Sequence, residues 1–336
     1  MKDQKFAVIL GVYGKPSDRF MAGGYKPAGL DVFERIKLAS ADPLVNGVEL
    51  IEGSDGDINR KNSAAVANAV RDAGLAICAV NPDLWGEIQW TYGTLGAPDT
   101  AIRRQAISRI QGAMDLAAQV DCPYVGLWPG QDGYDYLFQT DYQKLYDWWV
   151  EGVQACADHN PDIKIGLEYK PYEPRTHSFL DTAAKTLLFI RDVNRPNVGL
   201  TFDVGHAMII HENLGEVVAL AQRDRKLFHL HLNDNFADWD WDMNFGSVHL
   251  YDFIEMLYWL KRTEFNGWYS VDIFAYRTEG AASVQESLAW LRAMLDFVDR
   301  TGMDHFDQLL AAKDPIAVSR FFRKALFPKA LELEAG

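Results

Sequence analysis

The sequence predicts a single (β/α)8 barrel followed by a C-terminal helical extension, and three observations predict this fold. Short apolar, β-branched runs alternate with longer helical stretches along almost the whole chain, which is typical of strand–helix units around a parallel sheet. These apolar runs number eight, the usual number of strands in such a barrel. The 336 residues exceed the roughly 250 of a typical barrel, which leaves residues for an extension.

The predicted strands follow one another at intervals that leave room for a helix between most of them. They cover residues 6–13, 47–53, 75–81, 124–128, 164–170, 198–205, 227–233 and 268–274. Helical spacing is clearest for a set of apolar residues after the third strand: Ile102, Ile107, Ile110, Met114 and Leu116. Near the end of the barrel, Ser283 followed by Glu286 predicts the start of a further helix.

The domain organisation follows from this count. We expect residues 1–300 to form the barrel and residues 301–336 to form the extension, because no repeat, low-complexity tract or linker interrupts the earlier part. The extension is helical in pattern and carries apolar residues that a finished barrel does not need. We expect it to contact a neighbouring subunit in a homo-oligomer, a dimer or tetramer; packing against its own barrel is the alternative.

Composition excludes several classes of protein. A formal net charge of -14 argues against nucleic acid as a partner, because such binding depends on Lys and Arg neutralising phosphates. The first residues lack a signal-peptide pattern, and no apolar stretch approaches the roughly 20 residues of a membrane helix; we expect a cytoplasmic protein that does not bind membranes. Cys78, Cys122 and Cys156 lack metal-ligand spacing and are expected to be small buried residues in a reducing compartment.

Ionisable residues gather where the last four predicted strands end. The C-terminal ends of the strands face the active site in a barrel of this kind. The residues at these ends and in the turns that follow them are Glu168, Lys170, Asp203, His206, His229, His231, Asn233, Asp240, Asp242 and Asp272. We expect His229, one layer deeper than His231, to be a hydrogen-bonded core histidine.

These acids predict a metal site. Burying a carboxylate as an ion costs several kcal/mol unless it meets a cation, and Lys170 and Arg175 are too few to balance them. A salt bridge or a helix cap explains any one acid more simply, but acids at successive strand ends together favour one or two divalent ions. Oxygen-rich ligands with one imidazole per metal and no thiolate favour Mn, Mg or Co.

We assign the acids and histidines to two metal sites that share one carboxylate. The first predicted site consists of Glu168, Asp203, His231 and Asp272. The second consists of His206, Asp240 and Asp242, together with Asp203, which lies close enough to His206 in the chain to bridge both ions.

Three segments resemble a known family, the xylose isomerase-like TIM barrels. EYKPYEPR at 168–175 is similar to that family's acid-x-Lys-Pro-x-Glu-Pro-Arg stretch, and FDVGHA at 202–207 to its acid-x-Gly-His motif. DWDMNFG at 240–246 is similar to the Asp-x-Asp-x-x-x-Gly that completes the second metal site. Trp128 matches the aromatic wall beside the substrate. The resemblance implies two metals and a Lys170 that contacts the sugar oxygens at C1 and C2.

The chain also departs from the family pattern. The bridging acid is Asp203 where the family commonly has Glu, and His231 stands where xylose isomerase has Asp, which is more like rhamnose isomerase. The ring-opening histidine expected near the third strand is not apparent in residues 80–83. The sugar is therefore not expected to be simply glucose or xylose.

The expected function is a metal-dependent aldose–ketose isomerase that shifts hydrogen between C1 and C2 of a free monosaccharide. We expect Lys170, Glu168 and Asp272 to act in catalysis. The residues expected to bind the sugar are Trp128, Lys170, Asn233, Trp85 and Trp239. A ketose 3-epimerase, which uses one metal and two glutamates as opposed bases, a keto-inositol dehydratase and a non-catalytic sugar-binding protein of the same fold remain open alternatives.

Overall fold

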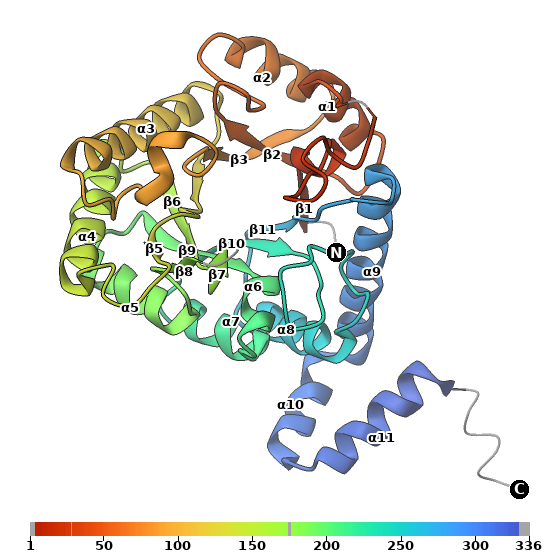
Figure 1. Ribbon diagram of the computed structural model, residues 1–336. Helices are drawn as coiled ribbons and strands as arrows, with labels where there is room; N and C mark the ends of the chain where they lie inside the picture. The colour runs from red at the N-terminus through yellow and green to blue at the C-terminus, as the bar shows by residue number, and fades with distance from the viewer. Residues whose placement is uncertain (1–3, 28, 174–175, 329–336) are drawn as a thin grey trace, which may run out of the picture.

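The computed structural model describes residues 4–27, 29–173 and 176–328. In this part of the chain, eight parallel strands close into a barrel in the order β1-β11-β10-β9-β6-β4-β3-β2 (Figure 1). The barrel strands are β1 Lys5–Ile9, β2 Gly47–Glu52, β3 Ala76–Pro82, β4 Tyr124–Leu127, β6 Lys164–Glu168, β9 Val198–Asp203, β10 Leu227–Leu232 and β11 Trp268–Val271. Each predicted run supplies one strand, and the predicted (β/α)8 barrel is confirmed.

Helices surround the barrel on its outer side, as Figure 1 shows. They are α1 Val32–Ser40, α2 Ser63–Asp72, α3 Thr100–Gln119, α4 Tyr142–His159, α5 Ala183–Val193, α7 Leu214–Arg223, α8 Leu250–Arg262 and α9 Gly280–Thr301. A short additional helix, α6 (Val204–Ile209), follows β9 directly. The first predicted strand is shorter than expected, because Leu10–Tyr13 forms a 3-10 helix, as does Ile88–Tyr92 after β3.

The predicted helix signals fall within α3 and α9. In α3 the predicted apolar residues Ile110, Met114 and Leu116 are buried. The prediction that α9 begins at Ser283 is wrong, because the helix starts about one turn earlier, at Gly280. Ser283 is buried, and its hydroxyl lies 2.8 Å from the hydroxyl of Thr278, so it is satisfied inside the helix.

Polar side chains occupy part of the barrel interior, and glycines make room for them. A Cβ at Gly166 in β6 would lie 1.6 Å from the hydroxyl oxygen of Tyr124 and 2.5 Å from that of Thr201. These two hydroxyls are hydrogen-bonded to each other across the space that Gly166 leaves. Likewise, a Cβ at Gly126 in β4 would lie 2.3 Å from Oδ1 of Asn81. Small residues therefore allow a buried polar layer to form in this barrel.

A small second sheet lies in the loops that follow β4 and β6. Its strands β5 (Gly133–Tyr134), β8 (Thr176–Ser178) and β7 (Tyr172–Glu173) pair antiparallel in that order. The sequence analysis did not predict this sheet. It joins two loops that leave the ends of barrel strands where the ionisable residues gather.

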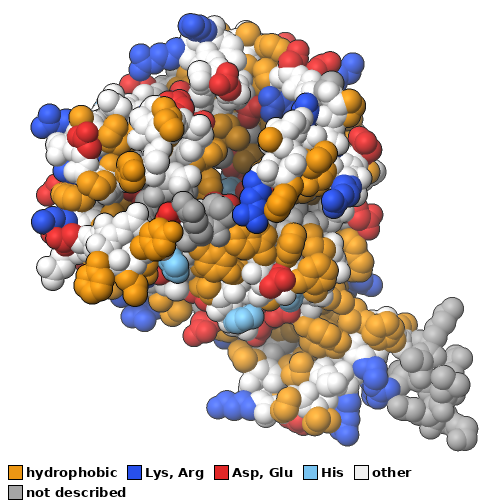
Figure 2. All heavy atoms as spheres, viewed as in Figure 1, with side chains coloured by type: hydrophobic (Ala, Val, Ile, Leu, Met, Phe, Trp, Pro, Cys, Tyr) orange, Lys and Arg blue, Asp and Glu red, His pale blue; other side chains and the backbone are white. Residues whose placement is uncertain are grey.

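The predicted helical extension is present as α10 (Met303–Ala312) and α11 (Pro315–Leu326), which project from one side of the barrel (Figure 1). α10 contacts α8 and α9, and Phe322 of α11 packs on Tyr251 with ring centroids 4.8 Å apart. Leu310, Ile316 and Phe327 are 48%, 56% and 60% exposed, and Figure 2 shows apolar side chains open on this projection. Residues 329–336 of the predicted extension lie outside the described residues. Contact with another subunit stays a prediction.

Two expectations from composition can be compared with the described part of the chain. No helix there is both long enough and apolar enough to cross a membrane. Cys78, Cys122 and Cys156 are buried free thiols, so the prediction that they are small buried residues is confirmed.

Candidate metal centre

The four residues predicted to hold the first metal lie together at the C-terminal ends of the strands. Glu168, Asp203, His231 and Asp272 each offer a ligand atom within 4.8 Å of the others. Nδ1 of His231 lies 3.3 Å from a Glu168 oxygen and 3.3 Å from an Asp272 oxygen. His231 and Asp203 are also register partners on neighbouring strands, so pairing of β10 with β9 sets both at one level. We call these four residues the first cluster.

Asp203, His206 and Asp240 form a second cluster, whose ligand atoms also lie within 4.8 Å of one another. The Asp203 carboxylate accepts hydrogen bonds from the backbone N–H groups of Gly205 and His206 at 2.8 and 3.1 Å. This cap on α6 fixes His206 relative to Asp203. Asp242, the remaining residue predicted for the second metal, is half-buried and lies outside that group.

Lys170 lies at the edge of the second cluster. Its ammonium is 2.6 Å from an Asp240 oxygen and also pairs with the carboxylate of Glu173. The same ammonium lies 5.1 Å from the centroid of the Trp128 ring. Lys170 is only 7% exposed, so a buried cation stands between the second cluster and the aromatic wall. Pro174 and Arg175, which complete the EYKPYEPR segment, lie outside the described residues.

The electrostatics of the two clusters indicate a shortage of positive charge. Burial raises the pKa of Asp272 to about 7; His231 opposes this shift, and the charges of Asp203 and Glu168 add to it. Burial and the neighbouring acids Asp240 and Asp272 likewise raise the pKa of Asp242. Burial alone would lower the pKa of His206, but Asp203 and Asp240 raise it to about 9. Protons are therefore drawn to this group of acids, which is the charge deficit that a cation relieves.

Unpartnered atoms make a second test of whether a metal fits. Among the described residues, the buried atoms Nδ1 of His231 and Oδ1 of Asp240 have no hydrogen-bond partner. Leaving such an atom unsatisfied costs roughly 1–3 kcal/mol, and each belongs to one of the two clusters. Carboxylate oxygens with one imidazole are ligands that Mg, Mn and Co accept. The residues present therefore fit a divalent ion.

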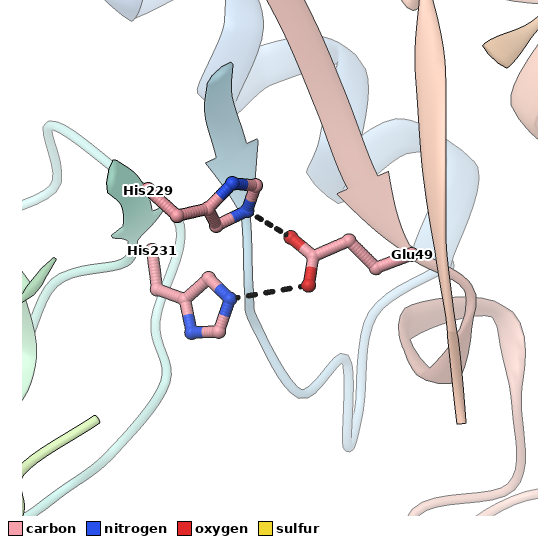
Figure 3. Close-up of side chains that lie close together, drawn as sticks. All are labelled: Glu49, His229 and His231. Atoms are coloured by element: carbon pink, nitrogen blue, oxygen red, sulfur yellow. Dashed lines mark hydrogen bonds and ion pairs between the residues drawn. The ribbon is translucent and has the colours of Figure 1, made fainter. Parts of the chain in front are cut away.

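Beneath the first cluster, Glu49 of β2 lies between two histidines of β10 (Figure 3). One of its oxygens is 2.7 Å from Nε2 of His229, and the other is 3.2 Å from Nε2 of His231. Burial alone would raise the pKa of Glu49, but the two histidines lower it well below its ordinary value. The prediction that His229 is a hydrogen-bonded core histidine is confirmed. The sequence analysis missed Glu49, although an acid inside an apolar strand is a signal in itself.

Comparison with known proteins gives the family. The family described as xylose isomerase-like TIM barrel matches residues 38–294. The chain belongs to this family. It is 29% identical to a xylose isomerase of Thermus thermophilus over 64% of this chain and 57% of that protein, so it spans little more than half of that relative's length. A xylose isomerase of Thermus caldophilus is 26% identical over 80% of this chain and 76% of that protein.

A solved structure shares the fold of this xylose isomerase-like barrel. The crystal structure of a D-allulose 3-epimerase from Methylomonas sp. superimposes with a TM-score of 0.67. The superposition covers 87% of this chain and 98% of the epimerase chain, and the two sequences are 16% identical. At this level of identity the likeness shows the fold alone.

The residues expected to bind the sugar make different contacts in this xylose isomerase-like barrel, and their role stays a prediction. A small pocket is lined by residues that include Trp128, Glu168 and Lys170, and Trp85 meets Trp128 edge to face at 5.2 Å. Trp239 instead packs on Tyr172 at 5.5 Å. Asn233 is fully buried and donates to both Asp203 oxygens at 3.1 Å, so its amide is directed at the carboxylate that the two clusters share.

Two buried aspartates that the sequence analysis did not single out hold the loops of this site. Asp132 accepts from the backbone N–H groups of Thr94 and Gly96 at 2.7 and 2.5 Å, which ties the loop after β4 to the segment between β3 and α3. Asp234 accepts from the N–H of Val248 and lies 2.8 Å from Nδ1 of His249. Asp234 therefore closes the loop that carries Asp240 in this xylose isomerase-like barrel.

Proposed function

We propose that the protein interconverts an aldose and a ketose, acting on a free monosaccharide with two divalent ions, Mn, Mg or Co. The observation that carries this proposal is the second cluster, which shares Asp203 with the first. An enzyme that uses one ion needs only the first cluster. In such an enzyme the second cluster would carry the free-energy cost of burying an acid and an imidazole, with no ion to offset it. The curated relatives named xylose isomerase support the same reaction class.

Under this proposal the two ions have different sets of ligands, which share Asp203. The first is held by Glu168, Asp203, His231 and Asp272, and the second by Asp203, His206, Asp240 and Asp242. When bound, such ions act as Lewis acids on the sugar oxygens. The amide of Asn233 and the N-terminus of α6 hold the shared Asp203 in place, so its carboxylate would be presented to both ions in one orientation.

Lys170 is the residue that we expect to donate to the sugar oxygen at C1. Burial alone would lower the pKa of its ammonium, but Asp240 and Glu173 raise it above the ordinary value, so Lys170 stays a cation at neutral pH. A buried, oriented cation stabilises negative charge that develops on an oxygen. We assign the other catalytic roles to Glu168 and Asp272, which flank Nδ1 of His231.

The aromatic wall supports a shift of hydrogen between C1 and C2. Trp128 and Trp85 present apolar surface beside Glu168 and Lys170, and we expect them to bind the sugar and to exclude water from the reacting carbons. Hydrogen that passes directly between the two carbons does not exchange with solvent. The direct test is to screen free aldoses and ketoses with Mn²⁺ in D2O. We expect a ketose from an aldose, with little deuterium on carbon.

The double variant Asp240→Asn with Asp242→Asn tests the need for the second ion. The first cluster is unchanged, so we expect one ion to remain bound and the fold to persist. Loss of Lewis-acid stabilisation of several kcal/mol should lower turnover on the order of a thousandfold or more. Asp238→Asn is the matched control, because this acid lies in the same loop with its side chain exposed. Near-wild-type turnover by the double variant with one ion bound would contradict the two-ion isomerase.

A ketose 3-epimerase is the second candidate, and a specific observation favours it. The Lys170 ammonium already supplies positive charge to Asp240, which leaves one cluster of four residues with Glu168 and Asp272 as opposed bases. Solved structures with this fold include a D-allulose 3-epimerase. Under this candidate the substrate is a ketose, deuterium from D2O appears at C3, and the double variant keeps its activity.

A further inference from the structure

Glu49 has no part in the proposed reaction, yet it contacts a residue of the first cluster. It is fully buried in β2, and Figure 3 shows its carboxylate directed at His229 and His231. One carboxylate oxygen of Glu49 lies 3.2 Å from Nε2 of His231. The opposite ring nitrogen of His231, Nδ1, faces Glu168 and Asp272.

Both ring nitrogens of His231 therefore face carboxylates, but only those at Nδ1, from Glu168 and Asp272, belong to the first cluster. A neutral imidazole carries one N–H, and the other nitrogen has the lone pair that can bind a metal. A carboxylate acceptor at Nε2 favours the proton on that nitrogen and so leaves the lone pair on Nδ1. Nδ1 has no hydrogen-bond partner among the described residues, which agrees with a nitrogen kept free for a ligand.

We propose that Glu49 is a positioning residue, which accepts the Nε2–H of His231 so that Nδ1 is presented to the first ion. This inference rests on the metal site of the proposed function. It concerns how the ion is held, and it does not depend on which sugar reaction follows.

Glu49 is itself held in one orientation, as this role requires. Its second oxygen receives His229 Nε2 at 2.7 Å, and the amide of Asn81 donates to the oxygen facing His231 at 3.0 Å. The ring of Tyr124 stacks on His229 with centroids 5.0 Å apart and an angle of 24° between the rings. A buried carboxylate is stable only when it is hydrogen-bonded in this way. The partners of Glu49 lie on two other strands, β3 and β10, so Glu49 cannot turn away from His231 without breaking these contacts.

The test compares Glu49→Gln with a matched control in the full-length protein. Gln keeps the shape of the side chain, but its amide can turn an N–H toward Nε2 of His231 and favour the proton on Nδ1. Asp57→Asn is the control, because Asp57 is also a buried carboxylate and follows the same strand. It pairs with Arg35 at 2.8 Å and, in the described contacts, makes none with His231. Co²⁺ titration followed by calorimetry and visible absorption measures the first site directly.

We expect Glu49→Gln to weaken binding of the first Co²⁺ by about 10- to 100-fold and to change its absorption spectrum. Asp57→Asn should bind Co²⁺ as the wild type does, even if its melting temperature falls. Unchanged affinity and spectrum in a folded Glu49→Gln protein would overturn the inference. The wild type could bind Co²⁺, and Glu49→Gln could weaken that binding, without any isomerase activity being found. In that case only the proposed reaction would fail, and the inference about Glu49 would stand.

A measurement on the wild type keeps the inference testable if Glu49→Gln does not fold. Two-bond nitrogen–proton correlations of the protein labelled with ¹⁵N-histidine and loaded with Zn²⁺ report which ring nitrogen carries the proton. We expect His231 to be protonated on Nε2 and to bind through Nδ1. A proton on Nδ1 would overturn the inference, as would an ion bound between Glu49 and the Nε2 atoms of His229 and His231. A wild type that takes up no divalent ion would overturn both the inference and the proposed function.

Discussion

The ammonium of Lys170 lies 2.6 Å from a carboxylate oxygen of Asp240, so the acid assigned to the second ion already has a cationic partner. Two unit charges 4 Å apart attract by about 4 kcal/mol at an effective dielectric constant of 20. Under the proposed function, an ion held by the second cluster would compete with Lys170 for Asp240. The Lys170 ammonium would then be available to a sugar oxygen, which would link occupancy of the second site to the position of Lys170.

This competition predicts that Lys170→Met has opposite effects on metal binding and on turnover. Removing the ammonium should raise the affinity of the second site for Mn²⁺ by about tenfold, a fraction of the pair's Coulomb energy, while turnover falls because the donor at C1 is lost. Calorimetric titration and initial rates measure the two effects. Lys185→Met, which removes a partly exposed ammonium 3.2 Å from Asp181, should change neither. Weaker Mn²⁺ binding to Lys170→Met would show that Lys170 does not compete for Asp240.

Removing divalent ions should lower both activity and stability. Ligands that bind only the native state stabilise it by about 2.7 kcal/mol for each site at a concentration 100 times the dissociation constant. Excess chelator should therefore abolish turnover and lower the melting temperature, and added Mn²⁺ should restore both. Elemental analysis that found no bound metal, with activity and melting temperature unchanged in chelator, would contradict the metal site.

Gly166→Ala should destabilise the barrel, because the added Cβ would lie 1.6 Å from the hydroxyl oxygen of Tyr124. The neighbours cannot yield easily, since this hydroxyl is buried against Thr201. Overpacking of this kind costs about 1–3 kcal/mol or more. Gly11→Ala is the control, because a Cβ there meets nothing within 4 Å. Urea denaturation should separate the two variants, and equal midpoints would mean that the polar layer of the barrel is loosely packed.

The three cysteines should be unreactive in the native protein. Burial raises the pKa of the Cys122 and Cys156 thiols to about 12 and raises that of Cys78 as well. A raised thiol pKa leaves little thiolate at pH 8, and the thiolate is the reactive form. Ellman's reagent should therefore modify none of them within minutes, and all of them after denaturation. A thiol that reacted in the native state as fast as free cysteine would show that the core opens locally.

We predict a homo-oligomer, a dimer or tetramer, in which the C-terminal helices contact a neighbouring subunit. The surface of these helices is apolar at three exposed residues, Leu310, Ile316 and Phe327. Replacing all three by Ser should shift the mass measured by light scattering towards that of a monomer, while the melting temperature of the barrel changes little. A wild type that is monomeric at micromolar concentration would show instead that these helices serve their own barrel.

The strands of the barrel could be predicted because of where they lie. A parallel strand covered by helices on one side and by the barrel interior on the other is apolar on both faces, so it appears as a continuous run. The same reasoning placed Glu168, Asp203 and Asp272, because an acid at the end of such a run is conspicuous. The strands β5, β7 and β8 have two or three residues each, too few for any periodic pattern.

Contacts between distant segments could not be predicted in the same way. Glu49 stands out as an acid in an apolar strand, but its partner His229 is 180 residues away, and only closure of the barrel shows which side chains face each other. The same holds for the contact between Asn233 and Asp203, which are 30 residues apart; sugar binding by Asn233 stays a prediction. Ser283 had the sequence pattern of a helix cap, but the chain entered α9 earlier and left that serine buried.

The bond between Glu49 and His229 bears on how the chain folds. β2 and β10 are separated in the barrel by β1 and β11, so this contact spans the interior and joins early and late segments of the polypeptide. Until β10 has been synthesised and docked, Glu49 lacks both of its imidazole partners, and contacts of such sequence separation form slowly. The orientation of His231 is therefore among the last features to be acquired, and a fragment that stops before β10 should not persist as a half-barrel.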